Sequence, residues 1–274
     1  MKNHLFRDRA PITEAGWEEI EKEAQRTLRA LLAARRVVDF KGPLGWGASD
    51  VELGRADPIA SPPQAKAVQA RLRRIQPLVE LRIPFDVSRA ELDAIDRGAR
   101  DPDLDSVTAA AREIAIAEDR AIFHGYAAAK IAGICPAQAS AAVPLGASHA
   151  DYPGAVSAAL TKLRDEGIEG PFAVVLSERL YKDLSSRTDE GYPIISHVRR
   201  LVDGDIVWAP GLDGGVVISL RGGDFELTVG QDFSIGYLDH TAERVRLYIE
   251  ESFTFLTLTE QAAIPLISGA GKKR

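Results

Sequence analysis

The chain has 274 residues, 45% of them hydrophobic, so it can bury a sizeable core in one large or two modest domains. Its formal net charge of −6 argues against a nucleic-acid partner, because neutralising phosphates requires a basic face. One cysteine, Cys135, excludes an internal disulfide framework, and no run approaches about 18 consecutive apolar residues, so we expect a cytoplasmic protein without a membrane partner.

The first predicted element is an amphipathic helix. The N-terminal sequence is charged throughout and lacks the apolar stretch of a secretory signal. Thr13 can cap a helix that runs to about Arg36. Its apolar residues recur at three- and four-residue steps: Trp17, Ile20, Ala24, Leu28, Leu31 and Leu32. Charged residues occupy the opposite face, so we expect the helix to lie on a surface.

The next segment cannot belong to a compact core. Residues 42–77 are rich in proline and glycine and carry only isolated apolar side chains. Connections of this length are uncommon in compact domains, and they are usually functional or disordered. Because strand-like sequence follows at Leu78–Phe85, we interpret the segment as an arm that reaches onto a neighbouring molecule.

Two helices are predicted after this strand. Ser88 and Glu91 have the spacing of a capping box that opens a short helix, which Gly98 ends. A longer helix is predicted from Pro102 to about Ala129, and its many alanines allow neighbouring elements to approach closely.

Beyond Gly133 helices and strands alternate. A helix near Ala155–Glu166 precedes a buried strand at Phe172–Leu176, and a helix capped by Ser177 then breaks down in the polar stretch SSRTDEGYP. Further strands are predicted at 206–208, 216–220 and 245–255. The elements are mixed without regular βαβ repetition, so the predicted class is α+β.

No catalytic or metal-binding constellation stands out. The histidines are scattered without ligand spacing (His4, His124, His149, His197 and His240). Glu118 and Asp119 are adjacent on the long helix, so they point to different sides and cannot form a carboxylate dyad by themselves. Phosphate-loop, nucleophile-elbow and dinucleotide motifs are missing, and Cys135 has no candidate histidine partner. These residues predict a protein that is not an enzyme and holds no metal.

Several segments in order along the whole chain carry a resemblance. They are LFRDRAPIT, RRVVDFKGPLGW, AEDRAIFHGY, DEGYP and WAP, and especially RGGDFELTVGQDFSIGY and YIEESFTF. Together they resemble the family 1 encapsulin shell proteins, some of which have been labelled linocins or bacteriocins. The resemblance implies the fold of tailed-bacteriophage major capsid proteins. It also implies self-assembly into an icosahedral nanocompartment, of the smallest (T=1) class, that encloses a peroxidase of the dye-decolourising kind or a ferritin-like protein through a C-terminal targeting peptide.

The resemblance implies a division of the chain into a peripheral domain, an axial domain and an arm. The lumenal helix and start of the peripheral domain would span 1–42, the extended arm 43–77, the peripheral domain with its spine helix 78–133, the axial domain 134–221, the peripheral sheet 222–267 and a disordered tail 268–274.

The same resemblance assigns two sites. Cargo-peptide contacts are implied on the inner wall at Leu28, Leu32, Arg35, Asp39, Ile235, Tyr237 and Ile249. The leucines could equally pack the helix on its own domain, and Arg35 and Asp39 are also an ordinary i,i+4 pair. A pore at the fivefold axis is implied at Asp189, Glu190, Gly191 and Tyr192. Repeated around the axis, the two carboxylates would make an acidic ring that favours cations.

The sequence argues against a flavin cofactor and against two other functions. Some relatives hold a flavin against a tryptophan that aligns with Ala90, and alanine offers no stacking surface, so we expect no cofactor. A prophage major capsid protein is disfavoured, because such proteins usually begin with a long helical scaffolding segment and Trp17 already lies in the predicted lumenal helix. A stand-alone hydrolase finds no support in the search for catalytic residues.

Overall fold

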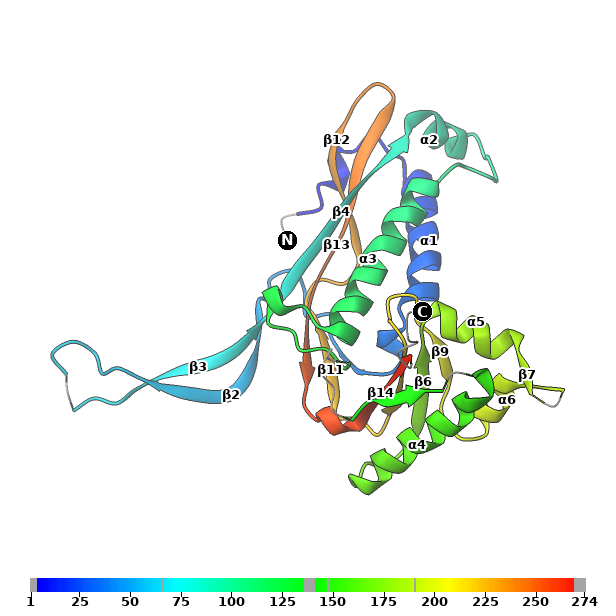
Figure 1. The fold of residues 1–274 in the computed structure, drawn as a ribbon. Helices are drawn as coiled ribbons and strands as arrows, with labels where there is room; N and C mark the ends of the chain where they lie inside the picture. The colour runs from blue at the N-terminus through cyan, green and yellow to red at the C-terminus, as the bar shows by residue number, and fades with distance from the viewer. Residues whose placement is uncertain (1–3, 66, 136–140, 147, 190, 269–274) are drawn as a thin grey trace, which may run out of the picture.

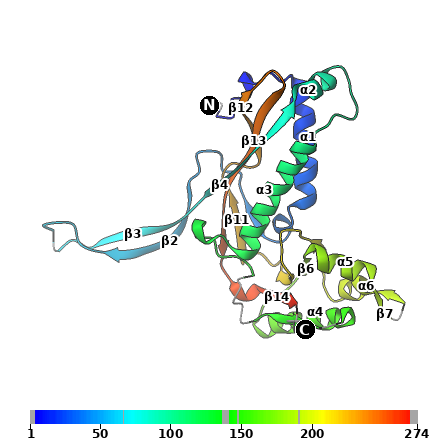
Figure 2. The same cartoon turned by 45° about the horizontal axis from the view of Figure 1, so that its top comes forward.

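The computed structural model describes residues 4–65, 67–135, 141–146, 148–189 and 191–268. These residues form two packed units of helices and sheet, from which one two-stranded arm projects (Figures 1 and 2). Short 3-10 turns connect several elements: η1 (Arg7–Arg9), η2 (Ala34–Arg36), η3 (Ala127–Ala129), η4 (His149–Asp151) and η5 (Glu260–Ala262).

The sheet of the first unit is built around one long strand, β13 (Arg244–Thr257). Along one side β13 pairs antiparallel with β4 (Val79–Ser88). Along the other side it pairs first with β12 (Ser234–His240) and then with β11 (Phe225–Val229), both antiparallel. β1 (Asp39–Lys41) adds to β11 in parallel. Side chains of β13 therefore alternate between the face of the sheet that packs against the helices and the opposite face.

Helices α1 (Glu14–Leu31) and α3 (Asp105–His124) lie along this sheet, and α2 (Arg89–Asp96) lies at its end (Figure 1). As predicted, the Thr13 hydroxyl caps α1, accepting a hydrogen bond from the Gly16 amide at 3.1 Å.

The predicted helix ends need correction. Helix α1 stops at Leu31 instead of near Arg36, because the Asp119 carboxylate accepts the amide hydrogens of Ala33 and Ala34 at 3.1 and 3.0 Å and diverts the chain into η2. Helix α3 stops at His124 instead of near Ala129, because Gly125 has a φ of 86° that a helix cannot continue.

The predicted capping box of α2 is also wrong, although the helix forms. Ser88 makes no side-chain cap hydrogen bond, and the Glu91 carboxylate instead accepts from the Asp103 amide at 2.9 Å. Gly98 follows the helix with a φ of 89°, as expected of a residue that ends it.

The arm is a hairpin of β2 (Asp50–Ile59) and β3 (Ala70–Pro77), paired antiparallel. It points away from both units in Figures 1 and 2. Its base is fixed to the first unit by the Gln76 side-chain amide, which donates to the carbonyls of Ala129 and Lys130 at 3.2 and 3.1 Å.

The second unit contains a five-stranded sheet in the order β5-β14-β10-β6-β9. Its strands are β5 (Val143–Leu145), β14 (Ala263–Ser268), β10 (Gly215–Ser219), β6 (Phe172–Leu176) and β9 (Ile206–Trp208). Every residue of β6 and β10 is buried, as the continuous apolar run at 172–176 predicts.

Helices α4 (Tyr152–Asp165), α5 (Glu178–Ser186) and α6 (Ile194–Arg199) belong to this unit. Between α5 and α6 lies a small hairpin of β7 (Thr188–Asp189) and β8 (Tyr192–Pro193).

Strand β14 corrects one predicted boundary. The sequence placed 222–267 in the first sheet, but after η5 the chain crosses to the second sheet, where β14 pairs with β10 and β5. Burial of Ile264 and Leu266 against that sheet explains the crossing. Ser268 ends this strand, and residues 269–274 of the predicted tail lie outside the described residues.

The two units share an apolar core. Phe225, Phe253 and Phe255 of the first sheet belong to the same buried cluster as Val174 and Ile218 of the second. Because interiors pack densely and transmit strain, this shared core fixes how the units sit on each other.

Candidate docking groove, arm and hairpin tip

A cavity of about 140 Å³ lies where α1 faces the start of β12. Three apolar side chains named from the sequence line it together: Leu28 of α1, Ile235 of β12 and Ile249 of β13. All three are buried, so they serve both as core and as cavity wall. Ala24 and Gln25 contribute the neighbouring turn of α1. With this apolar wall, the cavity is suited to an aliphatic side chain.

Two other predicted docking residues lie beside this cavity and do not line it. Leu32 follows the end of α1 and is half-buried. It packs against the apolar core cluster that contains Leu28, Ile235 and Ile249. Tyr237 stands two residues after Ile235 in β12, so their side chains share a face. Its phenol contacts His240 Nδ1.

Arg35 and Asp39 do not form the predicted i,i+4 pair, because Arg35 lies in η2 and Asp39 in β1, whereas such a pair requires a helix across both residues. Asp39 instead accepts the Gly223 amide hydrogen at 2.6 Å. Arg35 points into the first unit, where its Nε lies 2.9 and 3.0 Å from the two carboxylate oxygens of Glu118.

Arg35 is the centre of a buried charge network that the sequence reasoning missed. Its guanidinium also reaches Asp232 at 2.9 Å and Glu251 at 3.3 Å. Burial raises the pKa of Glu251 well above its ordinary value, and the neighbouring Glu118 charge raises it further. Burial also raises the pKa of Asp119 to about 7. Local sequence does not predict this arrangement. Asp119 is adjacent to Glu118 on α3, but the carboxylate that shares Arg35 with Glu118 is that of Glu251 in β13.

This network joins elements and offers no open catalytic site. Glu118 and Glu251 are fully buried, and Arg35 neutralises one of the two charges. Among the residues that the structure describes, no group of three or more histidines, cysteines or carboxylates could hold a metal ion.

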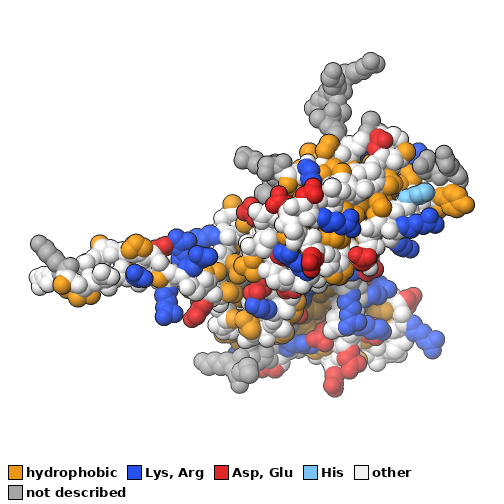
Figure 3. Space-filling view, turned by 90° about the horizontal axis from the view of Figure 1, so that it is seen from below, with side chains coloured by type: hydrophobic (Ala, Val, Ile, Leu, Met, Phe, Trp, Pro, Cys, Tyr) orange, Lys and Arg blue, Asp and Glu red, His pale blue; other side chains and the backbone are white. Residues whose placement is uncertain are grey.

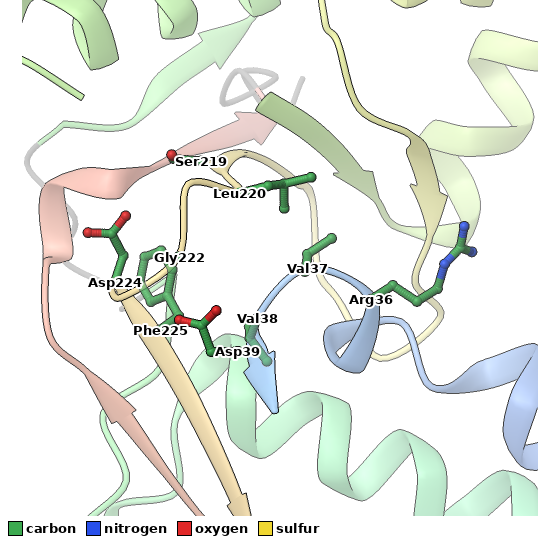
Figure 4. A pocket seen from close by; sticks show the side chains of 9 residues that line it. All are labelled: Arg36, Val37, Val38, Asp39, Ser219, Leu220, Gly222, Asp224 and Phe225. Atoms are coloured by element: carbon green, nitrogen blue, oxygen red, sulfur yellow. The ribbon is translucent and has the colours of Figure 1, made fainter. Parts of the chain in front are cut away.

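A second cavity, of about 160 Å³, lies at the junction of the two units. Figure 4 shows that its lining comes from the segment after α1 and from the segment between β10 and β11. Its charged groups are already paired: Arg36 with Asp205 at 3.0 Å, and Asp224 with Arg221 at 2.8 Å. With Asp39 bound to a backbone amide as well, the cavity presents no uncommitted charge to a ligand.

The predicted pore residues lie at the β7–β8 hairpin, the outermost point of the second unit (Figure 1). Asp189 pairs with Tyr192 across the hairpin, and Gly191 has a φ of 86°. The Tyr192 side chain is 65% exposed and meets the His197 ring edge-on. Glu190 lies outside the described residues.

The arm carries apolar side chains that the described residues of its own chain leave exposed. Ile59, Val68, Leu72 and Ile75 are each about half exposed or more. In the space-filling view, hydrophobic side chains lie along the arm among basic and other polar ones (Figure 3). Large exposed apolar areas mark interaction sites, so the arm has the character of a contact surface.

The remaining residues singled out in the sequence have ordinary environments. Ala90 lies exposed in the first turn of α2. Burial raises the pKa of Cys135 to about 12, which keeps the thiol protonated and unreactive. His124 Nε2 accepts the Asp213 amide hydrogen at 3.0 Å, and burial lowers the histidine pKa.

Comparison with known proteins decides the family. A family profile described as "Encapsulating protein for peroxidase" matches residues 1–254. The type 1 encapsulin shell protein of Rhodospirillum rubrum is 56% identical over 96% of this chain and 96% of its own length. That of Mycobacterium tuberculosis is 47% identical over 96% of this chain and 99% of its own. The chain belongs to the type 1 encapsulin shell proteins.

Solved structures resemble the chain in fold. A virus-like particle from Pyrococcus furiosus superposes with a TM-score of 0.63 at 14% identity, covering 92% of this chain and 99% of that one. A structure of Mycobacterium phage Bobi gives 0.59 at 16% identity, covering 88% and 91%. At such identities the likeness shows the fold alone. It confirms the predicted α+β fold of tailed-phage capsid proteins.

Membership of the encapsulin family also confirms that the chain is a structural shell protein and not an enzyme. No helix in the described part of the chain combines the length and the apolar character needed to cross a membrane.

Proposed function

We propose that this encapsulin subunit closes into an icosahedral shell of the smallest class, in the cytoplasm, and holds a cargo enzyme on its inner wall. The observation that carries the docking part is the cavity between α1 and β12, whose apolar wall joins Leu28, Ile235 and Ile249. A short C-terminal peptide of the cargo places aliphatic side chains in this cavity.

The energetics favour many weak contacts. Burying one aliphatic side chain contributes about 1.5–3 kcal/mol, and part of this gain offsets the entropy lost in ordering the peptide. Two or three such side chains gain about 3–9 kcal/mol before that cost is subtracted, so the net affinity is modest, at or weaker than the micromolar level of about −8 kcal/mol. Micromolar sites suffice because a cargo inside a closed shell faces many identical copies.

A peroxidase is the favoured cargo, because the matching family is described as encapsulating a peroxidase. A ferritin-like protein is the second candidate. A prophage capsid role is disfavoured, since the phage likeness is limited to fold at 16% identity whereas relatives at 56% identity are encapsulin shell proteins.

We place the β7–β8 hairpin at the fivefold pore. Its position at the tip of the second unit and its exposed Tyr192 support this placement. Five copies of Asp189 and Glu190 would surround the opening with negative charge, which favours cation entry.

Electron microscopy of the purified native protein, together with mass spectrometry of the proteins that co-purify, tests the whole proposal. We expect closed icosahedral particles with one enriched enzyme whose C-terminus can be exchanged onto another protein. A stable free subunit of about 30 kDa in mild buffer, or particles that never retain a partner, would refute it.

A further inference from the structure

The segment from His4 to Arg9, which we call the strap, runs beside the docking cavity. The carbonyl oxygen of Leu5 accepts the amide hydrogen of Tyr237 in β12 at 2.8 Å. Strand β12 is the last strand on this side of the sheet. The Leu5 carbonyl therefore accepts a hydrogen bond from a backbone amide at the sheet edge. Sheet edges are sites where extended peptides add as a further strand.

Side chains of the strap close the cavity opposite its apolar wall. Leu5 and Arg7 line it together with Leu28 and Ile235. The Arg7 guanidinium lies 4.1 Å from the centroid of the Trp17 ring and forms an ion pair with Glu21, which also lines the cavity. Leu5 thus presents to this cavity the aliphatic group that a docked peptide would present.

None of the strap residues is buried, and polar and ring contacts hold the strap, including His4 Nε2 at 3.1 Å from the carboxylate of Glu250. It contains one 3-10 turn, η1, whose residues are not buried. Phe6 has a φ of 50°, in the left-handed region that bulky side chains disfavour, and its side chain is 44% exposed. The His4 ring is stacked on Trp46, with the centroids 4.7 Å apart, so the strap also touches the base of the arm. Segments with few buried contacts and exposed hydrogen bonds open at low free energy.

We propose that the strap is a built-in competitor of the cargo peptide: it covers the docking cavity in an empty subunit and is displaced when cargo docks. This inference rests on the proposed function, because it concerns the same cavity. Displacement frees both the Tyr237 amide and the space next to Leu28, so an incoming peptide gains a backbone partner and an apolar contact together. Empty sites stay covered, and a weak or incorrect peptide cannot displace the strap.

The test uses the strap sequence itself as the probe. Shells lacking residues 2–9 and unaltered shells are each co-expressed with a fluorescent protein whose C-terminus carries HLFRDR after a flexible linker. If the strap leaves the cavity open for about one-tenth of the time, its deletion should raise reporter loading per shell about tenfold at sub-saturating expression. A tag with Leu5→Asp and Arg7→Glu is the matched control and should load poorly into both shells.

A second variant covers the case in which the truncated chain does not assemble. Full-length Leu5→Asp places a carboxylate near Glu21, loosens the strap and should give the same direction of change in particles of normal size. Equal loading of unaltered and variant shells, or loading no better than the control tag, would overturn the proposal. Natural cargo in unaltered shells is measured separately by mass spectrometry. Its presence would leave the proposed function standing when the strap proposal fails.

Discussion

The guanidinium of Arg35 binds the carboxylate of Glu118, with Nε 2.9 and 3.0 Å from the two oxygens. This contact joins the turn after α1 to α3. The same side chain reaches Asp232 before β12 and Glu251 in β13. One arginine therefore connects the docking helix to both strands behind the docking cavity.

Replacing Arg35 with methionine should destabilise the subunit strongly. The change would leave Glu118 and Glu251 buried without a counter-charge, and breaking a buried ion pair on one side costs about 3–5 kcal/mol. Denaturant unfolding of dissociated subunits measures the loss. The matched control is Arg29→Met at an exposed position of α1, which should change the unfolding free energy by less than about 0.5 kcal/mol. Equal effects of the two substitutions would contradict the assignment.

Asp119 should make subunit stability depend on pH. Its pKa is about 7 in the folded protein against 3.8 as the ordinary value, mainly because of burial, so the folded state binds more protons between these limits. The contribution of Asp119 to stability is therefore fully present below about pH 4 and is lost as the pH rises through 7. Asp119→Asn cannot titrate, so its unfolding free energy should fall less than that of the unaltered protein across this range. Parallel pH profiles for the two proteins would count against the shifted pKa.

The sequence predicted what depends on local pattern. The three- and four-residue apolar spacing of α1 and the Thr13 cap are properties of neighbouring residues, as is the shortage of apolar side chains in the arm. Leu28, Ile235 and Ile249 were named from family resemblance, and the structure brings them to one cavity.

What the sequence could not show depends on contacts between distant segments. Helix α1 ends where Asp119 of α3 accepts the Ala34 amide hydrogen. The carboxylate that interacts with Glu118 is that of Glu251 in β13. Ser88 and Glu91 have the spacing of a capping box, but the Glu91 carboxylate accepts the amide hydrogen of Asp103 instead. The strap cannot be predicted from local pattern, because its hydrogen bond with Tyr237 joins opposite ends of the chain.

Shortening the arm should block shell closure and leave the subunit folded. Glu52 and Ile75 are paired antiparallel near its base, so replacing residues 53–74 with Asn-Gly would close the hairpin with a two-residue turn. The Gln76 anchor to Ala129 is retained. We expect small species by size exclusion with the circular dichroism of a folded protein. Complete particles formed by the shortened chain would show that the arm is dispensable for assembly.

The hairpin tip should control cation entry. Changing Asp189→Asn together with Glu190→Gln removes the proposed acidic ring, and the uptake rate of a luminescent lanthanide ion into shells should fall about tenfold at low salt. The difference should shrink at high ionic strength, because the Debye length is then only about 3 Å in 1 M salt. Glu178→Gln, at the start of α5, is the control and should leave uptake unchanged. Unaltered uptake in the double variant would place the pore elsewhere.

Filling the docking cavity should give intact but empty shells. Ala24 is buried on α1 and lines the cavity, so Ala24→Leu adds apolar volume where the cargo side chain would enter and introduces no charge. Loss of one aliphatic contact of about 1.5–3 kcal/mol lowers peptide affinity roughly 10- to 100-fold. Ala30→Leu makes the same change at an exposed position of the same helix and should load normally. Cargo per shell, measured by quantitative mass spectrometry on particles of confirmed size, separates the two variants. Full loading of Ala24→Leu shells would move the docking site away from this cavity.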